Sequence, residues 1–334
     1  MKKTVKMIGM ACLLGAFAFA GSSCKKNNET TSVQVSMPVV AETTVDAEKA
    51  YIDYYDDMQM KWSAGDEIMV YNLNSDYTQS EAEVYTLASG ANTTVGNFHG
   101  DKAMSAEMDA GYYVFYPASK VVNYPLGPNN TQTFEVPAEQ TYNGETMDPT
   151  SLVMACKPTT GTFNEFNLDH IFGFIDVRLK GNTKSVQSVE LTDNAFNLTG
   201  NVSLELPLVN RDNLLALQAA CTNSTVTWEA YQATMISTLQ AMGYTSEPTG
   251  KSITLNCGGV QLKASEYTHF IFSLRPGCLA KGFVVKVTYT DGTSEVVNKF
   301  NPESAAWHYA SSPQFPRGFS IMPGTIMRVG ITLN

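Results

Sequence analysis

Two short motifs place acidic side chains beside other polar groups, and each motif has the residue types of hydrolytic or metal chemistry. Asp66 and Glu67 form an acidic pair directly after Gly65. The same residues are typical of a tight turn, because glycine adopts positive φ and aspartate hydrogen-bonds its own backbone. Asp169 and His170 have the types of an acid–base pair, but no nucleophile with a matching neighbourhood accompanies them. We therefore interpret the acidic pair as a turn and His170 as a structural histidine with satisfied ring nitrogens.

The cysteines and histidines lack the spacing of a metal centre. Structural zinc sites use closely spaced ligand pairs, whereas this chain has no CxxC motif and four scattered histidines. Four cysteines follow the N-terminal segment, and three complete disulfide pairings are open to them. They are Cys156, Cys221, Cys257 and Cys278. The alternative is that they are small buried apolar side chains. We expect neither a metal nor a cofactor.

The first 24 residues predict export from the cytoplasm. Three lysines precede an uncharged apolar run that is too short to span a bilayer as a mature helix, as in a secretory signal. Small residues from Gly21 onward lead to Cys24 and resemble the lipobox of bacterial lipoproteins, in which the cysteine is acylated and becomes the N-terminus. We expect a signal peptide over 1–23, lipidation of Cys24 and a polar tether over 24–31. Gly21 replaces the usual leucine, so ordinary signal cleavage is the alternative.

The composition excludes some classes of partner. Without residues 1–23, which contain three lysines and no acid, the chain keeps 19 basic and 32 acidic residues, a formal charge of −13. Such a negative chain is unsuited to nucleic acid. Only 16% of all residues are charged, while Thr, Ser, Asn, Gly and Tyr are abundant, as in extracellular β-structure. A mature length of about 310 residues favours two domains.

Both ends of the mature chain have the period-two alternation of a single β-strand. Residues 32–40 are expected to form one strand. Its apolar face consists of Val33, Val35, Met37 and Val39. Pro38 has no amide proton, so this strand should lie at a sheet edge or leave that side unpaired. Residues 325–333 are expected to form the last strand. Its apolar face consists of Met327, Val329, Ile331 and Leu333.

Between these ends, short apolar runs separated by turn residues predict an all-β chain built as two β-sandwich domains. The polar piece 157–161 separates an N-terminal domain over 32–160 from a C-terminal domain over 161–334. Residues 211–244 break the β pattern with apolar side chains at three- and four-residue steps. This spacing predicts a short helical insert laid across a sheet of the second domain.

Five short motifs are spread along the two predicted domains. They are the segment from Lys61 to Asn72, Phe115-Tyr116-Pro117, Val136-Pro137 with Gln140, the segment from Leu168 to Phe172, and Met322-Pro323-Gly324-Thr325. Together they resemble the fimbrillin family, the lipoprotein precursors of the pili of anaerobic Gram-negative bacteria. The resemblance implies two transthyretin-like β-sandwich domains in tandem and export as a lipoprotein. None of the motifs marks a catalytic residue.

The resemblance also implies assembly by strand exchange. In the family, a protease removes the N-terminal strand at the cell surface, and a strand of another subunit fills the groove. Backbone hydrogen bonds then supply affinity and alternating side chains supply register. Here the removable part is 32–49, with Val33 to Val39 as the resident strand, and the strand from Met327 to Leu333 is the candidate donor.

The position of the cut is inferred from the basic residues, because the family's protease usually cuts after a basic residue, often arginine. The first arginine of this chain is Arg178. Lys49 lies in the polar link after the first strand and is therefore the candidate processing site. Lys61, beside Trp62, is the alternative. The missing arginine also leaves open an uncut anchor or accessory subunit, or a protease of different preference.

We therefore expect a non-catalytic fimbrial subunit or surface adhesin, held on the outer membrane by lipid on Cys24 and present in the fimbrium. Expected partners are other fimbrial subunits, in a homo- or heteropolymer, and ligands on host or bacterial surfaces. The alternative is a surface glycan-binding lipoprotein, which needs coplanar aromatic side chains on an open face. Trp62, Trp228 and Trp307 are far apart in sequence. A hydrolase would need paired carboxylates or an activated nucleophile, and we find no such constellation in the sequence.

Overall fold

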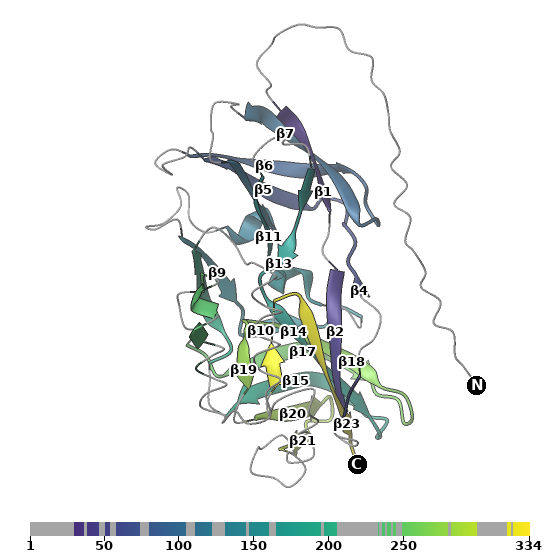
Figure 1. Ribbon diagram of the computed structural model, residues 1–334. Helices are drawn as coiled ribbons and strands as arrows, with labels where there is room; N and C mark the ends of the chain where they lie inside the picture. Colours follow the sequence, from purple (N-terminus) through teal and green to yellow (C-terminus); the bar gives the residue numbers. More distant parts are fainter. Residues whose placement is uncertain are drawn as a thin grey trace, which may run out of the picture.

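The computed structural model is an all-β protein, as the sequence predicts (Figure 1). It describes residues 30–36, 39–46, 51–53, 58–73, 80–104, 111–121, 131–144, 147–159, 165–194, 197–205, 233, 236, 237, 239–241, 243, 244, 249–279, 282–298, 319–321 and 323–334. The strands of these segments form three large sheets and two short pairs. No helix in the described part is both long enough and apolar enough to cross a membrane.

The first sheet has eight strands in the order β12-β1-β7-β6-β5-β8-β11-β13. They are β1 (Thr30–Ser36), β5 (Glu67–Leu73), β6 (Ser80–Ser89), β7 (Val95–Met104), β8 (Gly111–Tyr116), β11 (Met154–Thr159), β12 (Glu165–Asn167) and β13 (Asp169–His170). The sheet curls around an apolar core, because side chains of the end strand β12 and of β8, far from it in the strand order, meet there. The rings of Tyr112 on β8 and Phe166 on β12 have centroids 6.5 Å apart.

The second sheet has the order β18-β14-β23-β2-β3, with β4 also paired to β2. Its strands are β2 (Val39–Asp46), β3 (Tyr51–Asp53), β4 (Met58–Gln59), β14 (Gly173–Lys180), β18 (Thr268–Leu274) and β23 (Thr325–Thr332). The third sheet has the order β10-β17-β15-β20-β21. Its strands are β10 (Glu139–Thr141), β15 (Ser185–Asp193), β17 (Ser252–Gln261), β20 (Phe283–Tyr289) and β21 (Ser294–Val297).

The remaining described elements are short. They are the pairs β9 (Thr131–Val136) with β16 (Gly200–Glu205) and β19 (Gly277–Leu279) with β22 (Phe319–Ile321), and the 3-10 turns Ala118–Lys120 and Pro149–Ser151. Residues 233, 236, 237 and 239–241 are helical and lie in the predicted insert. Leu239 of this segment is buried in the main core, whereas Ile236 is exposed. Of these helical residues, Leu239 therefore packs against the core, whereas Ile236, which the spacing predicts on the same apolar face, does not.

The second and third sheets face each other across the main core. Because side chains alternate across a strand, β14 presents Ile175, Val177 and Leu179 to this core. Leu191 on β15 and Val285 on β20 are fully buried in the same core from the third sheet. These two sheets thus form a β-sandwich.

The expected single strand over residues 32–40 is wrong. The structure has two strands instead. β1 ends at Ser36 and belongs to the first sheet, whereas β2 begins at Val39 and belongs to the second. Pro38 lies between them in sequence and cannot donate to a ladder. β1 is also not an edge strand, because it pairs with β12 on one side and β7 on the other.

Hydrogen bonding crosses the division predicted near residue 160. β9 and β10 precede it but pair with β16 and β17. β12 and β13 follow it but belong to the first sheet. Strands from before and after residue 160 therefore share the same sheets.

His170 is buried where the first sheet meets the start of β23. Its side chain is 3% exposed, its ring stands edge-on to Phe174 with centroids 5.0 Å apart, and Gly324 packs against it. The structural interpretation of this histidine holds, but its ring nitrogens are not satisfied. Neither ring nitrogen has a hydrogen-bond partner within the described segments, and burial lowers the pKa of His170 to about 3.

We predict that His170 makes the fold sensitive to acid. Its pKa is about 3 in the folded chain against an ordinary value of 6.5, so below pH 6.5 the unfolded chain binds a proton that the folded chain does not. The free energy of unfolding is therefore not reduced by His170 above pH 6.5. It falls as the pH drops toward 3, by up to about 1.4 kcal/mol per pH unit. Urea unfolding of the wild type and His170→Leu over this pH range should show a shallower slope for the variant.

The matched control is His99→Gln, because His99 is exposed on β7. This variant should keep the wild-type slope. Equal pH slopes for the wild type and His170→Leu would show that His170 carries no acid sensitivity.

Candidate functional site: the two strands of the N-terminal segment

The first candidate site is the position of β1 in the first sheet. β1 runs parallel to β12, with Val35 opposite Phe166, and antiparallel to β7, with Val35 opposite Gly96. Val33 and Val35, two of the predicted resident-strand residues, are 5% and 0% exposed and lie in the core of the first sheet. The side chains of Met37 and Val39 lie outside the described residues.

Trp62 holds β1 in place by a hydrogen bond, although the two are 27 residues apart in the sequence. Its indole Nε1 donates to the backbone carbonyl oxygen of Val35 at 3.0 Å. The ring is 1% exposed and meets Phe98 and Tyr116 edge-on, with centroid distances of 4.7 and 5.3 Å. A side-chain donor thus binds the backbone of β1, the strand that the sequence analysis expects to be removed.

The turn after Trp62 positions this side chain, and the turn interpretation of Asp66 is confirmed. Gly65 has φ +86°, and the carboxylate of Asp66 accepts from the backbone N–H of Ser63 at 2.7 Å. The Tyr116 hydroxyl donates to the other carboxylate oxygen of Asp66 at 3.0 Å. This carboxylate is therefore used in fixing the turn. The described residues also contain no group of three or more His, Cys, Asp or Glu side chains arranged to hold a metal.

The second candidate site is the position of β2 in the second sheet (Figure 1). β2 lies parallel to β23 over six paired residues, from Ala41 opposite Thr325 to Asp46 opposite Gly330. On its other side it pairs antiparallel with β3 and β4. The N-terminal segment therefore contributes one strand to each of two sheets.

β23, the predicted donating strand, is an interior strand of its own sheet, parallel to both β14 and β2. The alternation of its side chains is as predicted. The residues of its predicted apolar face are at most 4% exposed and lie together in the main core; they are Met327, Val329, Ile331 and, directly after the strand, Leu333. Withdrawing β23 from this sheet would expose all of them.

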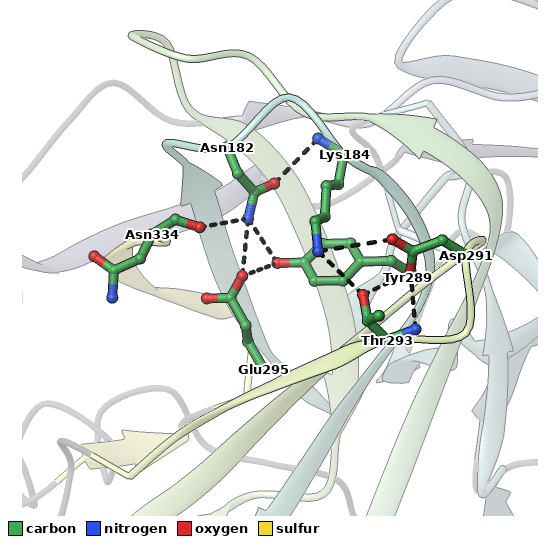
Figure 2. Close-up of polar contacts among 7 residues, drawn as sticks. All are labelled: Asn182, Lys184, Tyr289, Asp291, Thr293, Glu295 and Asn334. Atoms are coloured by element: carbon green, nitrogen blue, oxygen red, sulfur yellow. Dashed lines mark hydrogen bonds and ion pairs between the residues drawn. The ribbon is translucent and has the colours of Figure 1, made fainter.

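The end of β23 is also held by residues that follow β14 and by side chains of β20 and β21 (Figure 2). The Leu333 N–H donates to the carbonyl oxygen of Lys180 at 2.8 Å. The Asn182 side-chain amide donates to the backbone oxygen of Asn334 at 3.4 Å, to the Tyr289 hydroxyl at 2.8 Å and to Glu295 at 2.9 Å. These contacts make β23 a fixed strand beside the position of β2.

Neighbouring side chains extend this polar cluster to the β20–β21 hairpin (Figure 2). The Lys184 ammonium donates to the Thr293 hydroxyl at 3.1 Å and lies 4.7 Å from the centroid of the Tyr289 ring. Asp291 accepts from the Thr293 backbone N–H at 2.8 Å. Burial is the main cause that raises the pKa of Tyr289 to about 12, so its hydroxyl stays a neutral donor to Glu295.

The face of the second sheet that points away from the main core carries a charged cluster beside apolar residues that belong to the core of the first sheet. Asp176 on β14 is fully buried, and its carboxylate forms a hydrogen bond with the ring Nδ1 of His269 at 2.7 Å and an ion pair with Arg328 of β23 at 3.2 Å. Arg178 and Lys180 continue this face, and their cationic groups lie 5.0 and 4.4 Å from the centroid of the Tyr267 ring. The sequence analysis missed this cluster. Alternating charges along β14 were visible, but nothing in the sequence showed that β23 lies beside it.

Two of the four cysteines are free thiols, Cys156 and Cys257. Cys156 is buried, and burial raises the pKa of each of these thiols to about 12. They therefore have the chemistry of buried apolar side chains. Cys24 and Lys49, the predicted lipidation and processing sites, lie outside the described residues, as do Cys221 and the side chain of Cys278.

Comparisons with known proteins give structural similarity alone. No protein-family profile and no curated protein matches the chain. A "putative cell adhesion protein" of Bacteroides uniformis is 15% identical over 89% of this chain and 93% of its own, with a TM-score of 0.48. The tip fimbrial protein Mfa3 of Porphyromonas gingivalis is 10% identical over 89% of this chain and 94% of its own, with a TM-score of 0.33.

A third similar structure has a different name. It comes from "putative polysaccharide binding proteins" of Bacteroides thetaiotaomicron, is 8% identical over 80% of each chain and has a TM-score of 0.33. With TM-scores below 0.5, these likenesses carry no functional argument, and the function rests on the contacts of this chain.

We predict that Trp62→Phe loosens β1 without unfolding the protein. The variant keeps an aromatic ring but leaves the buried carbonyl of Val35 without its donor, which costs about 1–3 kcal/mol. Hydrogen exchange of the β1 amides should become faster, while exchange in β15 and β17 of the third sheet should stay unchanged. Phe98→Leu is the control for lost packing alone. If β1 exchanges equally fast in the wild type and Trp62→Phe, the indole does not hold this strand.

Proposed function

We propose that this chain is a non-catalytic subunit of a cell-surface fimbrium, or a surface adhesin, that assembles by strand exchange. One observation carries the proposal. The segment before residue 49 supplies β1 to the first sheet and β2 to the second sheet, while the rest of each sheet comes from later in the chain. A single segment at the N-terminus thus occupies two strand positions.

The geometry supports removal followed by replacement. Without the segment, β7 and β12 would lose the strand between them, and β23 would lose its neighbour on one side. Exposed edges of this kind pair readily with other strands. A strand from another subunit would restore the backbone hydrogen bonds and fill the apolar positions of Val33 and Val35, which is β-strand addition.

Processing in the link between β2 and β3 agrees with this arrangement. Lys49 lies in sequence between Asp46, the last residue of β2, and Tyr51, the first of β3. A cut there would detach β1 and β2 together, whereas a cut at the alternative Lys61 would also remove β3 and β4. Lipid on Cys24 would hold the uncut precursor on the outer membrane. Other fimbrial subunits are then the partners, with surface ligands as further ones.

No observation favours the glycan-binding alternative. The exposed large apolar side chains of the described segments are all aliphatic: Val84, Val95, Ile236 and Val296. Trp62, one of the three tryptophans of this alternative, is buried, and so are the tyrosines of β8. Trp228 and Trp307 lie outside the described residues. Asp66 fixes a turn and His170 is buried in the fold, and the proposal contains no catalytic step.

We predict that release of the N-terminal segment converts monomers into oligomers. The test uses the full chain with a protease recognition sequence inserted between Asp46 and Tyr51, folded first and cut afterwards. Once the β1–β2 peptide dissociates, size-exclusion chromatography with light scattering should show strand-exchanged oligomers.

Two controls accompany this experiment. The uncut chain should remain monomeric, and excess synthetic peptide covering residues 30–49 should suppress oligomers of the cut chain. Cut, peptide-free protein that stays folded and monomeric would contradict assembly by strand exchange.

A further inference from the structure

The second residue of β7 lies opposite β1 and has no side chain. Gly96 is paired with Val35 in the antiparallel register of β1 and β7. Its φ is not positive, so the backbone conformation does not require glycine at this position. A glycine inside a strand often marks a place where another group approaches closely. The missing side chain therefore leaves space for such a group.

Three side chains converge on this space. A Cβ added to Gly96 would lie 2.6 Å from Cδ1 of Leu87 and 2.8 Å from the Phe98 ring. It would lie 2.9 Å from Cδ1 of the Trp62 indole. All three separations are shorter than the about 3.5 Å at which carbon atoms pack well. The indole thus takes the place of a cross-strand neighbour of Val35, and its Nε1 donates to the carbonyl of this same residue.

The other side of Val35 is closed by β12. Phe166 is paired with Val35 in the parallel register of these strands and is buried. The Phe166 ring packs beside Tyr112, and all three residues belong to the core of the first sheet. The fully buried side chain of Val35 is therefore enclosed between an indole on the β7 side and a phenyl ring on the β12 side.

The outward-facing residues of β1 place weaker demands on an incoming strand. Ser32 is exposed, and Gln34 and Ser36 are half-buried. The Ser32 hydroxyl lies 3.2 Å from the ring Nδ1 of His99, and the Gln34 amide lies 3.5 Å from the Asn97 side-chain oxygen. These are long contacts at exposed positions. The size of a side chain is therefore constrained on the inner face of β1.

Alternation alone does not fix the register of a strand in this position. A strand shifted by two residues keeps its apolar face inward and its backbone pairing. The shift would, however, bring a different side chain between the indole and Phe166. A larger side chain in a filled site forces its neighbours to move, and a smaller one leaves a cavity. A size limit at this one position therefore distinguishes registers that the backbone does not.

We propose that Gly96 and Trp62 form the specificity-determining pocket of the β1 position. The pocket accepts an extended strand of another subunit that carries a side chain of the size of valine opposite Gly96, between two polar residues. This inference rests on the proposed strand exchange and names the chemistry of the partner. The indole contacts the same residue of that strand twice, at its backbone carbonyl and beside its side chain.

The test is a competition for the chain cut between Asp46 and Tyr51. A labelled peptide of residues 30–49 is bound, and its displacement by unlabelled competitors is followed by fluorescence anisotropy. Val35→Leu in the competitor should raise the concentration needed for displacement by about tenfold, near the lower end of overpacking costs. Gln34→Leu, which places the same side chain on the outer face, should compete like the native peptide.

The same peptides are then tested on a cut chain that carries Trp62→Phe. Both bind more weakly without the indole N–H, but the smaller ring leaves more room beside Gly96. The ratio between the Val35→Leu and native peptides should therefore fall from about tenfold to about threefold or less. Equal competition by these peptides on the wild-type cut chain, or an unchanged ratio on Trp62→Phe, would overturn the pocket while leaving strand exchange intact.

If the native labelled peptide does not bind at all, strand exchange itself fails, and the pocket is tested in the uncut chain. Val35→Leu and Trp62→Phe are then combined in a double-mutant cycle of urea unfolding. The proposal expects Val35→Leu to lower the folding equilibrium constant several-fold less when Trp62→Phe is already present. Additive effects of the two substitutions would overturn it.

Discussion

The arrangement of this molecule depends on the parallel pairing of β2 with β23. Parallel neighbours need a long connection between them, and here almost the whole chain lies between Asp46 and Thr325. The second sheet is therefore closed by strands from opposite ends of the sequence. Because β1 enters the first sheet just before β2 enters the second, one N-terminal segment joins both sheets. Both sheets therefore depend on that one segment for a strand.

The core shows why loss of this segment need not unfold the rest. The main core lies largely between the second and third sheets, and it also takes in Tyr113 and Phe115 from the first sheet. Phe174, Ile271 and Ile326 of the second sheet belong in turn to the core of the first. The two halves thus share apolar contacts that do not involve β1 or β2. Strand removal opens edges at the side of a structure that remains packed at its centre.

Sequence reasoning succeeded where the relevant contacts are local. Alternation located the buried face of β23, and the Gly65–Asp66 turn followed from the backbone preferences of two residues. The division between β1 and β2 was missed because alternation continues through Pro38, and period two cannot tell which sheet a strand joins. Lipidation of Cys24 and processing at Lys49 stay predictions.

Long-range polar contacts were beyond the sequence for a similar reason. The role of Trp62 was not predicted, because its indole donates to a backbone carbonyl 27 residues away in the sequence. Gln140 was noticed as part of a motif without a role. In the fold its amide pairs with both the N–H and the carbonyl of Ser273, at 3.0 and 2.8 Å, so the buried side chain acts as a short piece of strand at the edge of β18. Neither partner can be inferred without the tertiary structure.

The two faces of the second sheet differ in chemistry. Its inner face is apolar, and apolar burial is non-directional, so this face alone does not specify which strand lies beside β23. Its other face carries charged residues, Asp176 and Arg328, together with apolar residues that pack into the core of the first sheet, Phe174, Ile271 and Ile326. An exposed backbone edge is a hazard for aggregation, so the N-terminal segment, which pairs with β23 through β2, also covers this edge.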